Sequence, residues 1–277
     1  AAELVRHVPR ERVRTGRVQE HLDEILEHAE GVPLLLFLDP YGMTLDARTI
    51  AERLLRRGRG PARVPTEVLV NFATHTVRRE GGHMNSESPT PAAPSIIEGM
   101  NQFLDGTWWQ GLWGKSPEAD RAIAEGWGER IEGRAPGFKA FSMGVPRRWE
   151  GDPLYYLTLV TEHPQGGWFF ADSLRGSVKD FYRFDVGDRP QLFDPDYRGA
   201  EAVEVIAANL RRLVDERGTV RLGHVTRELY GEVLGFAGAK EVKKAVKLLH
   251  HRRLVDHDGV GELHDAVVGP GDSMSLI

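Results

Sequence analysis

The feature that most constrains the fold is an uninterrupted apolar run, Leu34–Leu38, which stands between Pro33 and Asp39. The run has the length of a strand, and it shows no alternation of polar and apolar residues. Such a run is typical of a parallel strand that is buried on both faces inside an α/β sheet. We therefore expect a central strand here, with its carboxyl end at Asp39.

The segments around this run predict a βαβ unit. Val18–Glu30 carries apolar residues at helical spacing and ends at Gly31, and Thr49–Arg57 predicts a second, shorter helix. Glu67–Phe72 predicts the next strand. A strand, a helix and a strand within so few residues indicate two parallel strands joined by a crossover helix. The fold class expected is α/β, of the Rossmann-like kind.

Composition excludes several classes of function. The chain has 277 residues, of which 40% are hydrophobic, and it has no cysteine. Disulfides, cysteine-ligated zinc, iron–sulfur clusters and thiol nucleophiles are therefore excluded. No stretch approaches the roughly 20 apolar residues that a membrane span requires. We expect a soluble, cytoplasmic protein.

Two domains are expected. The first, residues 1–190, contains a helical insertion at about 73–150, and four of its tryptophans lie close together in the sequence: Trp108, Trp109, Trp113 and Trp127. These side chains either form the core of the insertion, which we favour, or stack on a base. Strands are expected at Leu154–Thr161 and Trp168–Ala171, joined as a hairpin at Gly166-Gly167, and Asp188–Tyr197 is expected to be a linker.

The second domain, residues 200–268, has the element order of a winged helix. Helices are predicted at Ala200–Asp215, Val225–Leu234 and Ala239–Arg252, a short extended piece at Thr219–Arg221, and the start of a β-ribbon at Leu254–Gly259.

One face of the last predicted helix is basic. Lys240, Lys244, Lys247 and His251 share that face, opposite an apolar stripe. From Glu201 to His257 there are 11 Lys and Arg against 8 Asp and Glu, within a chain whose formal net charge is −5. A basic helix in this order predicts contact with DNA. The alternative is a solvated face in a module that binds only proteins.

The sharpest local motif, Asp39-Pro40-Tyr41-Gly42, directly follows the apolar strand. In open α/β sheets, ligands bind at the carboxyl ends of the strands. There Asp39 could accept a hydrogen bond from an amine and Tyr41 could stack on a flat ring, and Asn71, at the next strand end, is expected to face the same site. The alternative is that Asp39 only caps a helix or shapes a turn. No histidine spacing typical of a metal site occurs, so no metal ligands are predicted.

Several segments together resemble the three-Cys-motif partner protein family. They are Gly31–Gly42 with its Phe-Leu-Asp-Pro-Tyr-Gly end, Glu67–Phe72, Ile97–Trp109, Tyr155–Thr161 with the following Gly166-Gly167, and the winged-helix-like tail. The resemblance implies a class I methyltransferase-like fold that uses S-adenosylmethionine. It places Asp39, Tyr41 and Asn71 at the methyl acceptor and implies a radical-S-adenosylmethionine-type protein as a partner.

The sequence departs from that family at its beginning. Ala1 falls roughly at the family's third strand, so we expect the N-terminal cofactor loop to be missing from this chain. Gly16, Asp39 and Pro40 are the remaining candidates for cofactor contact, and Arg17 follows Gly16 where an acidic residue is expected. Two hypotheses stay open: a methyltransferase acting on a nucleic-acid base or related amine, and a non-catalytic partner that binds DNA or protein.

Overall fold

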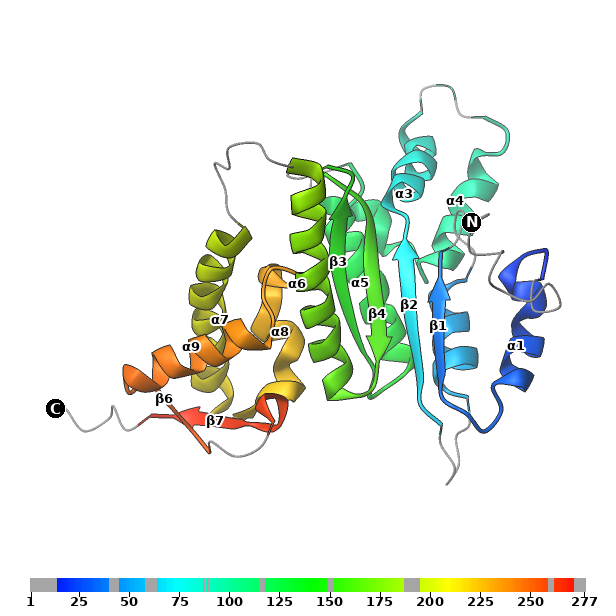
Figure 1. The fold of residues 1–277 in the computed structure, drawn as a ribbon. Coiled ribbons are helices and arrows are strands. Elements are labelled where there is room, and N and C mark those ends of the chain that lie inside the picture. The colour runs from blue at the N-terminus through cyan, green and yellow to red at the C-terminus, as the bar shows by residue number, and fades with distance from the viewer. Residues whose placement is uncertain are drawn as a thin grey trace. The chain divides into compact units, whose positions relative to one another are not determined.

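The computed structural model describes residues 14–39, 45–57, 64–86, 88, 90–114, 118–148, 152–186, 195–258 and 262–271. These residues form a mixed α/β structure with one four-stranded mixed sheet and one small antiparallel sheet of three strands (Figure 1). The chain divides into two compact units, the first comprising Ala1–Ala140 with Tyr155–Val160 and the second Phe141–Leu154 with Thr161–Ile277. The predicted domain boundary near residue 190 stays a prediction.

The four-stranded sheet has the order β1-β2-β4-β3. Its strands are β1 (Leu34–Leu38), β2 (Thr66–Phe72), β3 (Lys139–Pro146) and β4 (Pro153–Thr161). β1 and β2 are parallel, whereas β2 and β4 are antiparallel. The helix α2 (Ala47–Thr49) and the π-helix η4 (Ile50–Leu55) connect β1 to β2. This connection confirms the predicted βαβ order.

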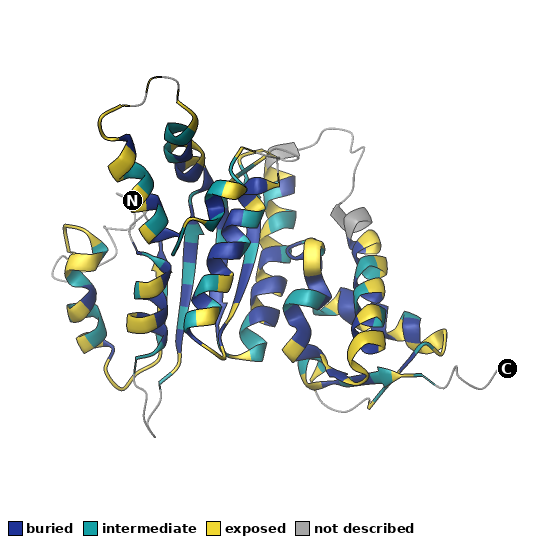
Figure 2. Ribbon diagram, turned by 180° about the vertical axis from the view of Figure 1, so that it is seen from behind, coloured by how far each residue is buried: buried dark blue, intermediate teal, exposed yellow. Residues whose placement is uncertain are grey.

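One face of the sheet is covered by helices of the first unit. These are α3 (Thr74–Gly81), α4 (Ala93–Phe103) and α5 (Ala119–Arg134), together with η4. Phe72 on β2 contacts the ring of Trp127 at a centroid distance of 5.2 Å. Trp109 and Trp127 are fully buried, and Figure 2 views this side of the molecule. Trp109 and Trp127 of the predicted insertion are therefore core residues, as we favoured, and Trp108 and Trp113 are partly buried against this core.

The prediction that β1 is a central strand buried on both faces is wrong. β1 lies at the end of the strand order, and its side chains alternate between partly buried and exposed positions. Leu35 is 65% exposed and Phe37 is 58% exposed. Periodicity failed here because both faces of β1 carry apolar residues although only one face is covered within the described residues.

The second unit contains a further correction, since Trp168–Ala171 is helical rather than a strand. It lies in α6 (Pro164–Val186), so no hairpin forms at Gly166-Gly167. Pro164 suits the first position of a helix because its missing N–H needs no partner there. Gly167 permits close packing, since a Cβ at this position would lie 2.5 Å from the Phe141 ring.

The remaining elements of the second unit follow the predicted order. They are α7 (Pro195–Arg217), β5 (Val220–Arg221), α8 (Thr226–Tyr230), α9 (Ala239–His251), β6 (Val255–His257) and β7 (Val267–Pro270). The three strands form an antiparallel sheet with the order β5-β7-β6. Residues 195–197 of the predicted linker belong to α7, and residues 187–194 lie outside the described residues.

Several short elements complete the described structure. They are η3 (Val18–His21), α1 (Leu22–His28), η5 (Gly82–Asn85), η6 (Trp108–Gly111), η7 (Leu222–Val225), η8 (Gly231–Val233) and η9 (Leu263–Asp265). Among the helices that the structure describes, none is long and apolar enough to cross a membrane.

Candidate functional site

The carboxyl ends of β1 and β2 bring two of the predicted site residues together. The Asn71 Nδ2 atom donates a hydrogen bond to the Asp39 Oδ1 atom at 2.6 Å. Asp39 is exposed directly after β1, and Asn71 is half-buried in β2. The expectation that these two side chains lie close together therefore agrees with the geometry. Pro40 and Tyr41, the other predicted residues of this motif, lie outside the described residues.

A residue that the sequence analysis missed, Tyr155, belongs to the same edge of the sheet. Phe72 lies opposite Tyr156 and Asn71 opposite Leu157, so the alternation along β4 puts Tyr155 on the Asn71 face. Burial raises the pKa of Tyr155, and the nearby Asp39 carboxylate raises that pKa further. Tyr155 thus offers a partly buried aromatic ring beside the carboxylate.

The polar atoms at this edge are acceptors with unused capacity. The Asn71 Oδ1 atom is buried and has no hydrogen-bond partner among the described residues. The Asp39 Oδ2 atom likewise accepts no hydrogen bond from any described residue. Two oxygen acceptors and an aromatic ring suit a flat molecule that carries an amino group, because each amine hydrogen needs an acceptor.

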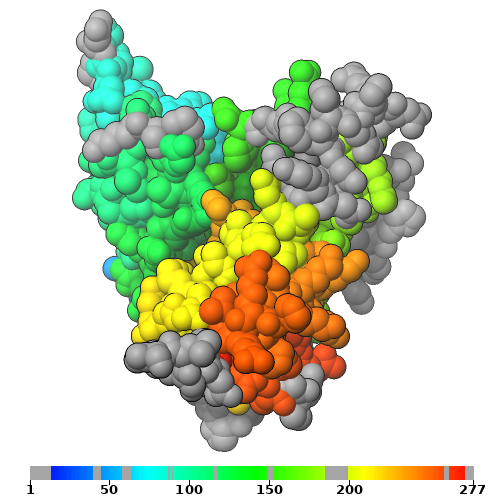
Figure 3. All heavy atoms as spheres, turned by 90° about the vertical axis from the view of Figure 1, so that its left-hand side faces the viewer, coloured from blue at the N-terminus to red at the C-terminus, as the bar shows by residue number. Residues whose placement is uncertain are grey.

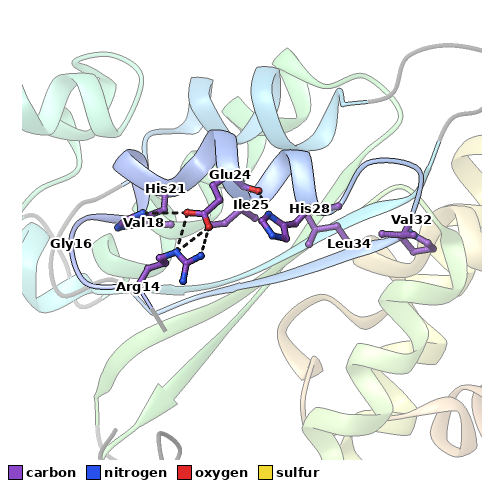
Figure 4. A pocket seen from close by; sticks show the side chains of 11 residues that line it. Arg14, Gly16, Val18, His21, Glu24, Ile25, His28, Val32 and Leu34 are labelled. Carbon is purple, nitrogen blue, oxygen red and sulfur yellow. Dashed lines mark hydrogen bonds and ion pairs between the residues drawn. The ribbon is translucent and has the colours of Figure 1, made fainter. Parts of the chain in front are cut away.

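The predicted cofactor residue Gly16 lines a different place, a groove of about 920 Å³ beside α1. The groove is lined mainly by apolar side chains of α1 and of the segment that leads into β1, and Figure 4 shows its lining. Arg14 donates through its Nε atom to both Glu24 carboxylate oxygens, at 2.9 and 3.1 Å. This pairing lowers the pKa of Glu24 and raises the pKa of Arg14. Asp39 does not line the groove.

Within the described residues, the lining of this groove offers no unpaired carboxylate for the ribose of S-adenosylmethionine, the cofactor that the family resemblance implies. A ribose needs a carboxylate that is free to accept from its hydroxyls, but Glu24, the only carboxylate among the lining residues, is held by Arg14. A Cβ at Gly16 would lie 2.6 Å from a carboxylate oxygen of Glu20, so this glycine approaches its own helix. We therefore derive no reaction step through this cofactor.

No metal site emerges in the part of the chain that the structure describes. Groups of three or more His, Asp or Glu side chains with suitable spacing do not occur there. His83 lies 3.9 Å from Glu80, which is an ion-pair distance within one turn of a helix.

The second candidate region is the exposed face of α9. Its exposed residues are Lys240, Lys243, Lys244, Lys247, His250 and His251, so every exposed position of α9 carries a basic side chain. These six include all four residues that the sequence analysis assigned to DNA contact. The orange segment that contains α9 lies on the face turned toward the viewer in Figure 3.

The lysines on this face form no ion pair within the described residues. His250 lies 3.5 Å from Asp256, and no comparable acidic partner is present for Lys240, Lys243, Lys244 or Lys247. The one acidic residue of α9, Glu241, is 2% exposed and faces away from the basic side chains. Four unpaired ammonium groups therefore project from one helix face.

Side chains of α6 contact the amino end of α9. The Asp172 Oδ1 atom accepts from the Ala239 N–H at 2.8 Å, and Arg175 donates to Glu241 at 2.7 Å. Glu241 also accepts from the Gly238 N–H at 3.0 Å. A Cβ at Gly238 would lie 2.1 Å from the Asp172 carboxylate, which shows how close the two helices come. This network fixes the start of α9.

Tyr230 on α8 lies next to this network. It is fully buried, its ring contacts the Trp168 ring edge-on at 5.5 Å, and its hydroxyl has no partner among the described residues. Burial raises the pKa of Tyr230, with smaller contributions from Asp172 and Glu241. The packing of α6, α8 and α9 therefore holds several polar groups away from water.

Comparisons with protein-family models, with curated proteins and with solved structures found no match. The strand ends at Asp39 and Asn71 and the basic face of α9 therefore carry the functional evidence in this protein.

Proposed function

We propose that this protein binds double-stranded DNA through the basic face of α9. The second unit supports this proposal by its element order, since three helices and a three-stranded antiparallel sheet with the order β5-β7-β6 are typical of a winged helix. In that arrangement α9 takes the place of the recognition helix. The single observation that carries the proposal is that all exposed positions of α9 are Lys or His.

The charge distribution explains how an acidic chain could bind a polyanion. The formal net charge is −5, so the protein as a whole has no general attraction for DNA. Each lysine that neutralises a phosphate releases condensed counterions and contributes about eightfold in affinity at about 0.1 M salt. Four unpaired lysines on one helix face would supply the local attraction that the whole chain lacks.

The proposal is tested by fluorescence anisotropy with a short labelled DNA duplex. Lys244→Glu with Lys247→Glu should weaken binding by about 100-fold at about 0.1 M salt, because two contacts are lost and repulsion is added. A matched control, Arg212→Glu with Arg217→Glu on α7, makes the same change in net charge and should leave affinity within about threefold. Unchanged binding in the α9 variant would count against the proposal, provided that both variants unfold at similar denaturant concentrations.

A second candidate function is favoured by the hydrogen bond between Asn71 and Asp39. We propose that this edge of the sheet recognises an amino group, as in a methyltransferase-like protein that acts on a nucleic-acid base or related amine. The parallel β1–β2 pair with its crossover helix supports a Rossmann-like origin for this unit. Asp39 would accept from the amine and Tyr155 would contact the flat ring. The partnership with a radical-S-adenosylmethionine-type protein remains a prediction.

Calorimetry distinguishes a methyltransferase from a protein that only binds an amine at this edge of the sheet. S-adenosylmethionine is titrated into the protein, and then adenosine and cytidine are titrated into the protein and into Asp39→Leu. Heat with the cofactor would support the enzyme hypothesis, whereas its absence would leave amine recognition alone. Nucleoside binding of equal strength in Asp39→Leu, which has no acceptor oxygen, would exclude Asp39 as the acceptor.

A further inference from the structure

We infer that α9 binds duplex DNA through phosphate groups alone, without preference for base sequence. This inference rests on the proposed function and adds the mode of recognition. Helix-turn-helix proteins that read sequence place the first residues of the recognition helix against base edges. At the amino end of α9, carboxylates of this chain occupy the backbone N–H groups of Gly238 and Ala239.

Contacts within the chain occupy that end. Asp172 on α6 caps the Ala239 N–H, and Glu241 is buried against Arg175, so α6 packs against the first turn of α9. The two carboxylates also offset the partial positive charge at the start of a helix. A phosphate or a guanine edge near Gly238 would meet negative charge and packed side chains.

The residue types exposed on α9 also favour contact with phosphates. Arg and Lys read guanine, and Asn and Gln read adenine, through hydrogen bonds to base edges; of these four residue types only lysine is exposed on α9. Lysine carries a compact charge on a flexible stem, so it selects a base less strictly than the rigid, planar guanidinium of arginine and suits phosphates equally well. From Lys240 to His251 the basic face extends over about 16 Å, at about 1.5 Å per residue, so it can lie along several phosphates.

A change at Asp172 can remove the negative charge at the start of α9 and keep the hydrogen bond that caps the helix. Asp172→Asn keeps an oxygen that can accept from the Ala239 N–H but removes the negative charge. We expect this variant to bind every duplex about threefold more tightly, by the same factor for each, because a helix start without a carboxylate attracts phosphates. A gain confined to one sequence would contradict the inference.

The deciding experiment measures the affinity of the full chain for several unrelated duplexes and for duplexes selected from a random pool. We expect dissociation constants within about threefold of one another, and each single Lys→Gln change on α9 should reduce the slope of log affinity against log salt by about one. A selected sequence that binds 10³-fold more tightly than the others, about the usual lower bound for specific recognition, would overturn the inference and leave the proposed function standing. Absence of binding to any duplex would overturn both, and tighter binding to single-stranded RNA or to heparin would overturn the duplex assignment.

Discussion

The helices α7 and α9 contact each other in the same small unit and share one apolar core, but their exposed faces differ. On α7, exposed acids and bases alternate and form ion pairs one turn apart, such as Arg211–Asp215 and Arg212–Glu216. On α9 the exposed face is entirely basic and its lysines are unpaired. Both helices have an ordinary amphipathic pattern, so stability does not explain the difference.

The exposed charges of α9 reduce the stability of that helix, whereas those of α7 increase it. Like charges at neighbouring helical positions destabilise a helix by a few tenths of a kcal/mol per pair, whereas opposite charges stabilise it by similar amounts. α7 uses the favourable arrangement and α9 the unfavourable one. A helix that concentrates unpaired lysines is therefore better explained by an external anion than by folding.

The largest expected effect comes from neutralising α9. Replacing Lys240, Lys243, Lys244 and Lys247 together by Gln should weaken duplex binding by roughly 10³-fold at about 0.1 M salt, because four counterion-releasing contacts disappear. Arg212→Gln with Arg217→Gln on α7 serves as the control and should change affinity by less than about twofold. Anisotropy titrations measure both. Equal losses in the two variants would remove the distinction between the helices.

The next effect concerns the ion pair beneath α9. Arg175→Met leaves the Glu241 carboxylate buried without its cation and should cost about 3 kcal/mol of unfolding free energy. Denaturant titrations provide the measurement. Adding Glu241→Gln should recover part of the loss, because the unpaired charge is then gone. If Arg175→Met unfolds at the wild-type denaturant concentration, the network does not fix the start of α9.

A smaller effect depends on pH. The pKa of Tyr230 is raised in the folded state, so the unfolded chain ionises first as pH rises. The stability that this shift provides is fully present below the unfolded pKa of about 10, and about 1.4 kcal/mol of it is lost by about pH 11. Tyr230→Phe should match the wild type at neutral pH, since the hydroxyl has no partner, and should lose less stability at alkaline pH. Parallel alkaline losses in the two proteins would disprove this.

The smallest effect is expected on α7. Arg212→Ala removes an exposed ion pair with Glu216 and should cost only about 0.3–0.5 kcal/mol at low salt, and less at high salt. Denaturant titrations at two salt concentrations test this. A loss above about 1 kcal/mol would mean that the surface pairs of α7 matter as much as the buried pair of α9.

The sequence predicted the elements whose pattern depends on local spacing. The stripe Val242, Ala245, Val246 and Leu249 predicted α9 and therefore also the face that would carry its lysines. The sequence did not predict α6, because Gly166-Gly167 has the composition of a turn although Gly167 in fact allows the helix to approach Phe141. It also could not show that β1 is an edge strand, since an apolar run has the same composition in either position.

The sequence predicted those parts of the candidate sites that lie at strand ends or on one face of a helix, because both follow from local residue patterns. Parallel strands end at one edge, which is why Asp39 and Asn71 could be placed together before the structure was known. Tyr155 was missed because its place at that edge depends on β4 running antiparallel to β2. The contacts of Asp172 and Arg175 with the start of α9 join residues about 66 positions apart, and no local pattern indicates such pairs.

The exposed strand β1 also has a practical consequence for handling the protein. Within the described part of the chain, β1 ends the sheet, displays Leu35 and Phe37 and carries no charged residue, which is a pattern prone to edge-to-edge association. Solutions of this chain should accordingly show concentration-dependent aggregation. Phe37→Lys would place a gatekeeper charge in this strand and should improve solubility without affecting α9.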